Sequence, residues 1–187
     1  LILERGELHI QVAHNRAKPL SVYAGGKIVQ AVGTAFNVEI NSEQKIELLV
    51  TEGKVLVAVH HGSAGDDGRI VPSVLTDASV AVSAGEQILL GASDGELIKI
   101  NPEEIKVKLS WREGDLVFRG ESLEDAMVEI NRYTPVEFVI VDEDLKRVRI
   151  AGLFRAGDVN GLLAALRKNF NISHERTKDG KVLLSPN

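Results

Sequence analysis

Short runs of alternating apolar and polar residues fill the first part of the chain, and a turn containing glycine precedes each run. Examples are residues 6–12, 24–29, 52–59 and 84–90. Alternation with a period of two is typical of strands that bury one face, and no helical period separates the runs. The pattern predicts a β-rich domain over residues 1–100, built as a meander, a sandwich or a short solenoid.

Two segments depart from this alternation. Residues 61–69 are rich in glycine and aspartate and are predicted to form a mobile loop. Asn101 and Pro102, followed by two glutamates, have the composition of a helix start. Asparagine can cap the helix, proline suits its first position, and acidic side chains in the first turn complement the helix dipole. We therefore expect a linking helix over residues 101–112.

The rest of the chain contains an internal repeat at an offset of 36 residues, in which residues 117–119 align with residues 153–155. Ser122 and Asp158 occupy the same position in the two copies, and an apolar stripe with helical spacing follows each of them. Each copy is predicted to form a strand, a capped helix and a second strand.

The repeat ends in one more strand, predicted over residues 181–185. Two βαβ units closed by this strand predict a second domain over residues 113–187, with both helices on one small sheet. The predicted fold class is thus mostly β plus α+β.

Charge and composition narrow the possible functions. The chain has 22 basic and 27 acidic residues, for a formal charge of -5, and the basic residues are scattered. This distribution argues against nucleic-acid binding and against a polybasic membrane patch. The longest apolar runs are far shorter than the roughly 20 residues that cross a bilayer. The chain begins at Leu1 as though within a strand, so we expect it to be part of a longer protein.

Motifs for catalysis or metal binding are missing from the sequence. The five histidines form no helical pair of the zinc-protease type, and there is no cysteine to supply a thiolate ligand or nucleophile. No nucleophile elbow, phosphate loop or dinucleotide fingerprint is present. We therefore expect neither an enzyme active site nor a cofactor nor a metal ion.

One reaction stays open because it needs few groups. The hydroxyl of Thr34 could attack the carbonyl of Gly33, and the resulting ester could then be hydrolysed. Strain at a glycine turn would favour this shift. The alternative is that Gly33 supplies an unusual φ angle and Thr34 begins a strand.

Segments in both halves of the chain carry a family resemblance. Residues 22–39 (VYAGGKIVQAVGTAFNVE), 50–57 (VTEGKVLV) and 83–87 (SAGEQ) resemble the core pattern of FecR-type transmembrane anti-sigma factor regulators. In the second half, WREGDLVF, INRY and IAGLF are similar to the domain that comes next in that family. The resemblance implies a β-rich FecR domain and then a module like the short N-terminal domain of secretins and TonB-dependent transducers.

The resemblance also implies a function. In such systems a cytoplasmic region holds an extracytoplasmic-function sigma factor, one helix crosses the inner membrane, and the remainder lies in the periplasm. There it binds the N-terminal signalling domain of an outer-membrane TonB-dependent receptor, commonly one that imports ferric siderophores. Some members cleave themselves at a Gly-Thr bond, which corresponds here to Gly33-Thr34. The chain would be the periplasmic sensor region and not an enzyme.

A small sheet offers two docking modes, strand addition at an edge or contact with an open face. On this basis the predicted partner-binding residues lie in two segments: Arg147, Arg149, Ala151 and Leu153, and Val182, Leu183 and Leu184. A third possibility is a β module that binds envelope polysaccharide, which would require exposed aromatic side chains.

Overall fold

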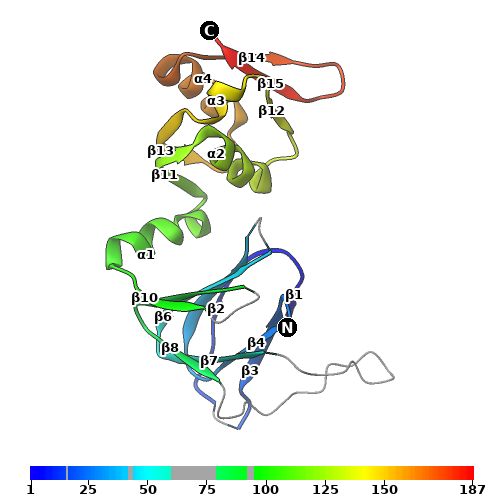
Figure 1. Ribbon diagram of the computed structural model, residues 1–187. Coiled ribbons are helices and arrows are strands. Elements are labelled where there is room, and N and C mark those ends of the chain that lie inside the picture. Colours follow the sequence, from blue (N-terminus) through cyan, green and yellow to red (C-terminus); the bar gives the residue numbers. More distant parts are fainter. Residues whose placement is uncertain (16, 42–43, 60–78, 92–94) are drawn as a thin grey trace. The chain divides into compact units, whose positions relative to one another are not determined.

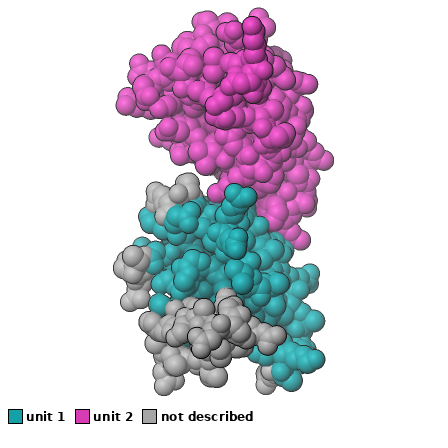
Figure 2. Space-filling view, turned by 90° about the vertical axis from the view of Figure 1, so that its right-hand side faces the viewer, with its two compact units in different colours: residues 1–105 teal, residues 106–187 magenta. Residues whose placement is uncertain are grey.

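The computed structural model describes residues 1–15, 17–41, 44–59, 79–91 and 95–187. The loop predicted over residues 61–69 lies outside these ranges. The chain divides into two compact units, residues 1–105 and 106–187 (Figure 2).

Unit 1 is built from strands (Figure 1). They are β1 (Ile2–Leu3), β2 (Gly6–Gln11), β3 (Leu20–Ala24), β4 (Lys27–Ala31), β5 (Ala35–Ile40), β6 (Ile46–Glu52), β7 (Lys54–Val59), β8 (Val80–Ser83), β9 (Glu86–Leu90) and β10 (Glu96–Lys99). One five-stranded sheet has the order β1-β3-β4-β7-β8, and the other has the order β10-β9-β6-β5-β2. Every pairing is antiparallel except that of β1 with β3.

The core of unit 1 lies between these two sheets. Buried side chains of β3, β4, β7 and β8 meet those of β5, β6 and β9 in one cluster, which includes the fully buried Phe36. Of the meander, sandwich and short solenoid that the sequence left open, the structure has the sandwich. Successive hairpins belong alternately to the two sheets, so strands that pair within one sheet, such as β4 and β7, are distant in sequence. The apolar faces of both sheets point toward the shared core.

A short helix begins where the sequence predicts one. Helix α1 (Pro102–Lys108) starts after Asn101, whose Oδ1 accepts a hydrogen bond from Glu104 N–H at 2.9 Å. Asn101 Nδ2 in turn donates to the Glu104 carboxylate at 2.9 Å, which completes a reciprocal cap. The 3-10 helix η1 (Ser110–Glu113) comes directly after it.

Unit 2 contains the two copies of the sequence repeat. The first copy is β11 (Asp115–Ser122), α2 (Leu123–Ile130), the 3-10 turn η2 (Asn131–Tyr133) and β12 (Phe138–Ile140). The second is β13 (Arg149–Arg155), α4 (Val159–Phe170) and β14 (Ile172–Arg176). A short helix, α3 (Glu143–Lys146), joins the copies, and β15 (Val182–Pro186) ends the chain. The predicted caps are confirmed, because Ser122 and Asp158 accept hydrogen bonds from the N–H of Asp125 and Gly161.

The first strands of the two copies pair with each other. Strands β11 and β13 are antiparallel, and the repeat-equivalent residues Val117 and Leu153 lie directly opposite each other. The equivalent Phe118 and Phe154 bring their ring centroids to 5.7 Å, tilted by 58°, on the inner face of this ribbon. Both rings belong to the buried cluster of unit 2. Equivalent residues of the two copies therefore pack against each other in the core of unit 2.

The strands of unit 2 form two sheets, which corrects the prediction of one. Strands β11 and β13 make a two-stranded sheet, and the other has the order β12-β15-β14. The second strands of the copies do not join the first pair, because β15 pairs with both of them, parallel to β12 and antiparallel to β14. The predicted class, mostly β plus α+β, is confirmed, whereas α3 was not predicted.

Candidate functional site

The turn that joins β4 to β5 contains the Gly33-Thr34 bond. Gly33 has a φ of +62°, in the left-handed region that glycine adopts without strain. Thr34 is only 2% exposed, and its carbonyl oxygen accepts a hydrogen bond from Val12 N–H at 2.7 Å. Its hydroxyl is also buried and has no hydrogen-bond partner within the described part of the chain. A buried hydroxyl left in this state costs about 1–3 kcal/mol.

Two further residues enclose this turn. A Cβ built on Gly33 would lie 2.3 Å from His14 Nδ1, so the imidazole packs directly against the glycine backbone. On the other side is Gly53, in the β6–β7 turn, where a Cβ would lie 2.8 Å from Thr34 Cγ2 and 3.0 Å from the Gly33 oxygen. Any side chain at Gly33 or Gly53 would therefore displace its neighbours.

Neither His14 nor Gly53 was singled out from the sequence. Nothing in the spacing of His14 links it to Gly33, since the contact depends on the pairing of β2 with β5, which the hydrogen bond from Val12 N–H to the Thr34 carbonyl continues. Gly53 carried a weak signal as the glycine of a predicted hairpin turn. The β4–β5 turn thus contains a buried hydroxyl next to the Gly33 carbonyl, and the His14 imidazole and the Gly53 backbone pack against this turn.

The predicted docking residues of the first segment are exposed. Arg149, Ala151 and Leu153 alternate along the outer face of β13, and the Leu153 side chain is 64% exposed. Arg147 is also exposed but lies before the strand, at the C-cap of α3. Arg149 Nη1 donates to the Gly120 carbonyl at 3.0 Å, beside the bulge of β11. Leu153 is therefore available for a contact, although a single exposed apolar side chain is common on protein surfaces.

Strand β13 also has an open edge. Ala156 N–H donates to the Gly114 carbonyl at 2.9 Å, which makes residues 114 and 156 a hydrogen-bonded pair. Because such pairs alternate along an antiparallel ladder, the backbone groups of Ala151 and Leu153 point away from β11. They have no hydrogen-bond partner among the residues that the structure describes. This edge could accept another strand.

The second predicted segment does not form an edge. β15 is the central strand of its sheet, so both of its sides are already paired. Val182 and Leu184 are buried at 1% and 0% exposure, and Leu183 is half-buried on the opposite face. Strand addition at residues 182–184 is therefore excluded in this fold. A chain-terminal strand would often be an edge, but here β15 is inserted between the two copies.

Two lysines in unit 2 form ion pairs with nearby glutamates. Lys181 Nζ donates to the Glu137 carboxylate at 2.9 Å, and this hydrogen bond raises the pKa of Lys181 above its ordinary value. In the same way, the hydrogen bond to Glu143 raises the pKa of Lys146. Both pairs are on the surface and stabilise the fold only weakly.

Two other kinds of feature are absent from the part of the chain that the structure describes. Over the described ranges, no group of three or more His, Asp or Glu side chains is arranged to hold a metal ion. No helix in the same ranges has both the length and the apolar character to cross a membrane. Four of the five phenylalanines, Phe36, Phe118, Phe138 and Phe154, are buried, so none of these four offers a stacking platform for a sugar.

Comparisons with known proteins agree with the architecture. The family model described as FecR protein matches residues 1–56, and the model described as FecR, C-terminal, matches residues 115–184. Two crystal structures, at 1.65 and 2.50 Å resolution, of a "putative anti-sigma factor" from Parabacteroides distasonis ATCC 8503 have a similar fold. Each has a TM-score of 0.68 and 21% sequence identity, over 100% of this chain and 80% of that one. No curated protein matches the chain.

The two family matches together cover more than half of the chain and include both units. The chain belongs to the FecR family of anti-sigma regulators, which are signalling proteins of the inner membrane with a periplasmic region.

Proposed function

We propose that this chain is the periplasmic sensor region of an inner-membrane regulator and that it binds the N-terminal signalling domain of an outer-membrane TonB-dependent transducer. Through this contact the protein relays a signal, such as the arrival of an iron siderophore, to an extracytoplasmic-function sigma factor. The role is binding and not catalysis. Family membership supports the class of function, and the partner is this proposal's own step.

We assign the proposed roles to three segments. Residues 1–100 form the FecR-like domain, residues 101–112 link the two domains, and residues 113–187 form the docking module. The module resembles the short N-terminal domain of secretins and of the transducers themselves. Two domains of related fold can pair strand to strand, since each offers an edge of similar length and twist.

The observation that carries this proposal is the open edge of β13. Ala151 and Leu153 turn their backbone groups outward, and Leu153 exposes an apolar side chain on the same strand. An added strand would gain main-chain hydrogen bonds from this edge and would bury the leucine side chain. Arg149 and the preceding Arg147 supply positive charge at one end of the surface, although Arg149 already contacts Gly120.

Calorimetric titration of residues 1–187 with the receptor's signalling domain tests the proposal. We expect saturable one-to-one binding in the micromolar range or tighter, which corresponds to about -8 kcal/mol. Leu153→Asp should weaken binding by about tenfold or more, since it places a charge in the apolar contact. Val128→Asp is the matched control, because Val128 is a similarly exposed apolar residue on α2, at 45% exposure.

The possible results separate the function from the surface. No binding by the folded wild-type chain would contradict the proposed function. Equal binding by the Leu153→Asp and Val128→Asp variants would leave the partner in place but would reject β13 as the contact.

A second candidate function is self-cleavage at Gly33-Thr34, and the buried, unpaired hydroxyl of Thr34 favours it. Thr34 Oγ1 would attack the Gly33 carbonyl carbon, and His14 would accept the hydroxyl proton. The carbon–nitrogen bond would break as the Thr34 nitrogen takes up a proton, leaving an ester between Gly33 and the Thr34 side chain. Water would then hydrolyse the ester, giving a Gly33 carboxylate and a free Thr34 amine and hydroxyl.

Mass spectrometry of the purified chain tests this reaction. Fragments 1–33 and 34–187 should appear with wild type, appear faster in hydroxylamine because it cleaves esters, and vanish with Thr34→Ala. His14→Ala should slow the reaction. Thr51→Ala is the control, since the Thr51 hydroxyl is nearby in the same unit but donates to the Ala35 carbonyl at 3.1 Å. A wild-type chain that stays intact under these conditions, or a Thr34→Ala variant that still fragments, would reject self-cleavage.

A further inference from the structure

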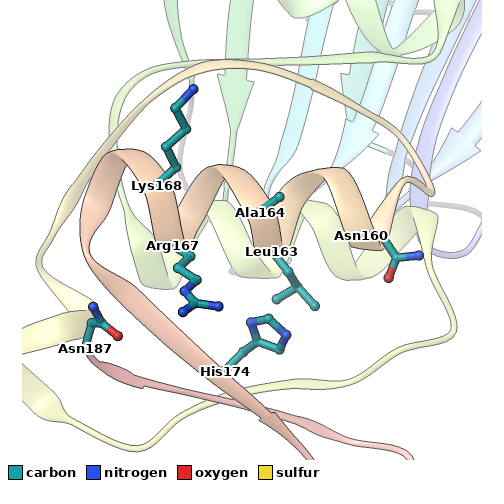
Figure 3. A pocket seen from close by; sticks show the side chains of 7 residues that line it. All are labelled: Asn160, Leu163, Ala164, Arg167, Lys168, His174 and Asn187. Carbon is teal, nitrogen blue, oxygen red and sulfur yellow. The ribbon is translucent and has the colours of Figure 1, made fainter.

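A groove of about 590 Å³ lies along α4 and β14 in unit 2. The residues that line it are Asn160, Leu163, Ala164, Arg167, Lys168, His174 and Asn187. Figure 3 shows the side chains of Leu163 and Arg167 directed from the helix toward His174 on the strand, whereas the Lys168 side chain, which also lines the groove, extends in another direction. Leu163 is buried and forms the apolar floor, and Arg167 is exposed above it.

The strand side of this groove is an open sheet edge. The hydrogen bonds at the two ends of β14 are Asn187 N–H to the Asn171 carbonyl (3.0 Å) and Thr177 N–H to the Lys181 carbonyl (2.9 Å). Because hydrogen-bonded positions alternate, Ile172, His174 and Arg176 direct their N–H and C=O groups away from β15. These groups have no partner among the described residues. The strand beside the groove can therefore pair with another strand.

The groove is positively charged. Helix α4 contains no acidic residue, and Arg167 has no carboxylate partner in the described part of the chain. On β14, His174 and Arg176 share one face, and Arg176 Nη2 donates to Asn160 Oδ1 at 2.9 Å. The carboxylate of Glu175 lies on the opposite face, since successive strand residues alternate. Positive charge is thus confined to the helix side of the edge.

We propose that this groove binds an extended acidic segment of a partner protein, which adds to β14 as a strand. Main-chain hydrogen bonds would form with Ile172, His174 and Arg176, and carboxylates at alternate positions would face Arg167 and Arg176. A shift of one residue would turn these carboxylates toward Glu175, so charge fixes the register. The inference goes beyond the proposed receptor contact, which uses β13.

A model peptide gives a direct test on the full chain. The probe is a blocked peptide of about ten residues that alternates Glu and Thr, because threonine favours an extended strand. Amide NMR should show saturable shifts at Ile172, His174 and Arg176 but not at Ala151 or Leu153. The same peptide with Lys in place of Glu should not bind.

Matched variants identify the contacts. Arg167→Glu should weaken the peptide by about tenfold or more, as expected when a charge-assisted hydrogen bond is replaced by repulsion. Lys178→Glu makes the same charge change at an exposed residue of the β14–β15 turn that does not line the groove, so its effect should be several-fold smaller. His174→Pro removes one outward N–H, which an edge strand tolerates, and should abolish binding with the fold retained. If this variant does not fold, the comparison of Arg167→Glu with Lys178→Glu decides.

Three results would overturn the proposal: no shift at β14 with the acidic peptide, equal binding of the lysine peptide, or equal loss in the Arg167→Glu and Lys178→Glu variants. Shifts at β14 that depend on chain concentration without any peptide would also overturn it, because a second copy would then occupy the edge. Titration of the receptor domain into Arg167→Glu should match wild type, which keeps this test separate from the proposed function.

Discussion

The two copies of the repeat in unit 2 share one order of elements but present different surfaces. In the first copy β12 has three residues, and α3 packs against it. In the second copy β14 has five residues and an open edge. The helices also differ, since α2 carries Glu124, Asp125 and Glu129 whereas α4 carries Arg167 and Lys168. A repeat therefore fixes a scaffold, and the residues outside its buried positions decide what each copy can bind.

The largest effects should come from the core positions that the copies share. Phe118→Ala and Phe154→Ala should each lower the free energy of unfolding by about 3–5 kcal/mol, because the two rings are equivalent, buried and in contact. Denaturant unfolding of both single variants and the double variant measures the costs and a coupling of about 0.5–1.5 kcal/mol. Leu153→Ala is an exposed control. Costs that differ severalfold between the copies would contradict their structural equivalence.

The caps should give a smaller and again similar effect. Ser122→Ala and Asp158→Ala each remove the side chain that accepts a hydrogen bond from the third residue of its helix. Each should cost about 1 kcal/mol of stability, measured by thermal or denaturant unfolding. A negligible cost at either position would show that the caps are not equivalent although the sequence repeat aligns them.

The smallest effect concerns α3, which packs against α2 and β12 of the first copy. The hydrogen bond to Glu143 raises the pKa of Lys146, so the folded chain holds this proton more tightly than the unfolded chain. The resulting stability is fully present below the unfolded pKa and is lost as pH rises through the folded pKa. The difference in Tm between wild type and Lys146→Met should therefore shrink above about pH 10.4. A difference that is constant up to pH 12 would contradict this origin.

The repeat and the alternation predict much of the fold because the apolar positions in both patterns are the positions that become buried. The stripe after Ser122 and the stripe after Asp158 become the buried faces of α2 and α4, and the caps form as expected. Local patterns of this kind depend on neighbours in sequence. They fix the elements and their inward faces.

The pairing of distant strands could not be predicted in the same way. Val182 and Leu184 alternate as the residues of either an edge strand or a central strand would, so the sequence does not show that β15 lies between β12 and β14. The contact of His14 with Gly33 likewise depends on the pairing of β2 with β5, with no sequence pattern to indicate it. In contrast, alternation places Arg149, Ala151 and Leu153 on one face of a strand, and the structure shows that this face is exposed. Their role in binding stays a prediction.

Amide hydrogen exchange on residues 1–187, with and without the receptor's signalling domain, tests the central claim most directly. The outward amides of Ala151 and Leu153 on β13 should exchange quickly in the free chain and become protected in the complex. Amides of β15, already paired on both sides, should change little. Protection of the β13 edge would support docking by strand addition at the second copy. Binding without any protection at Ala151 and Leu153 would contradict it.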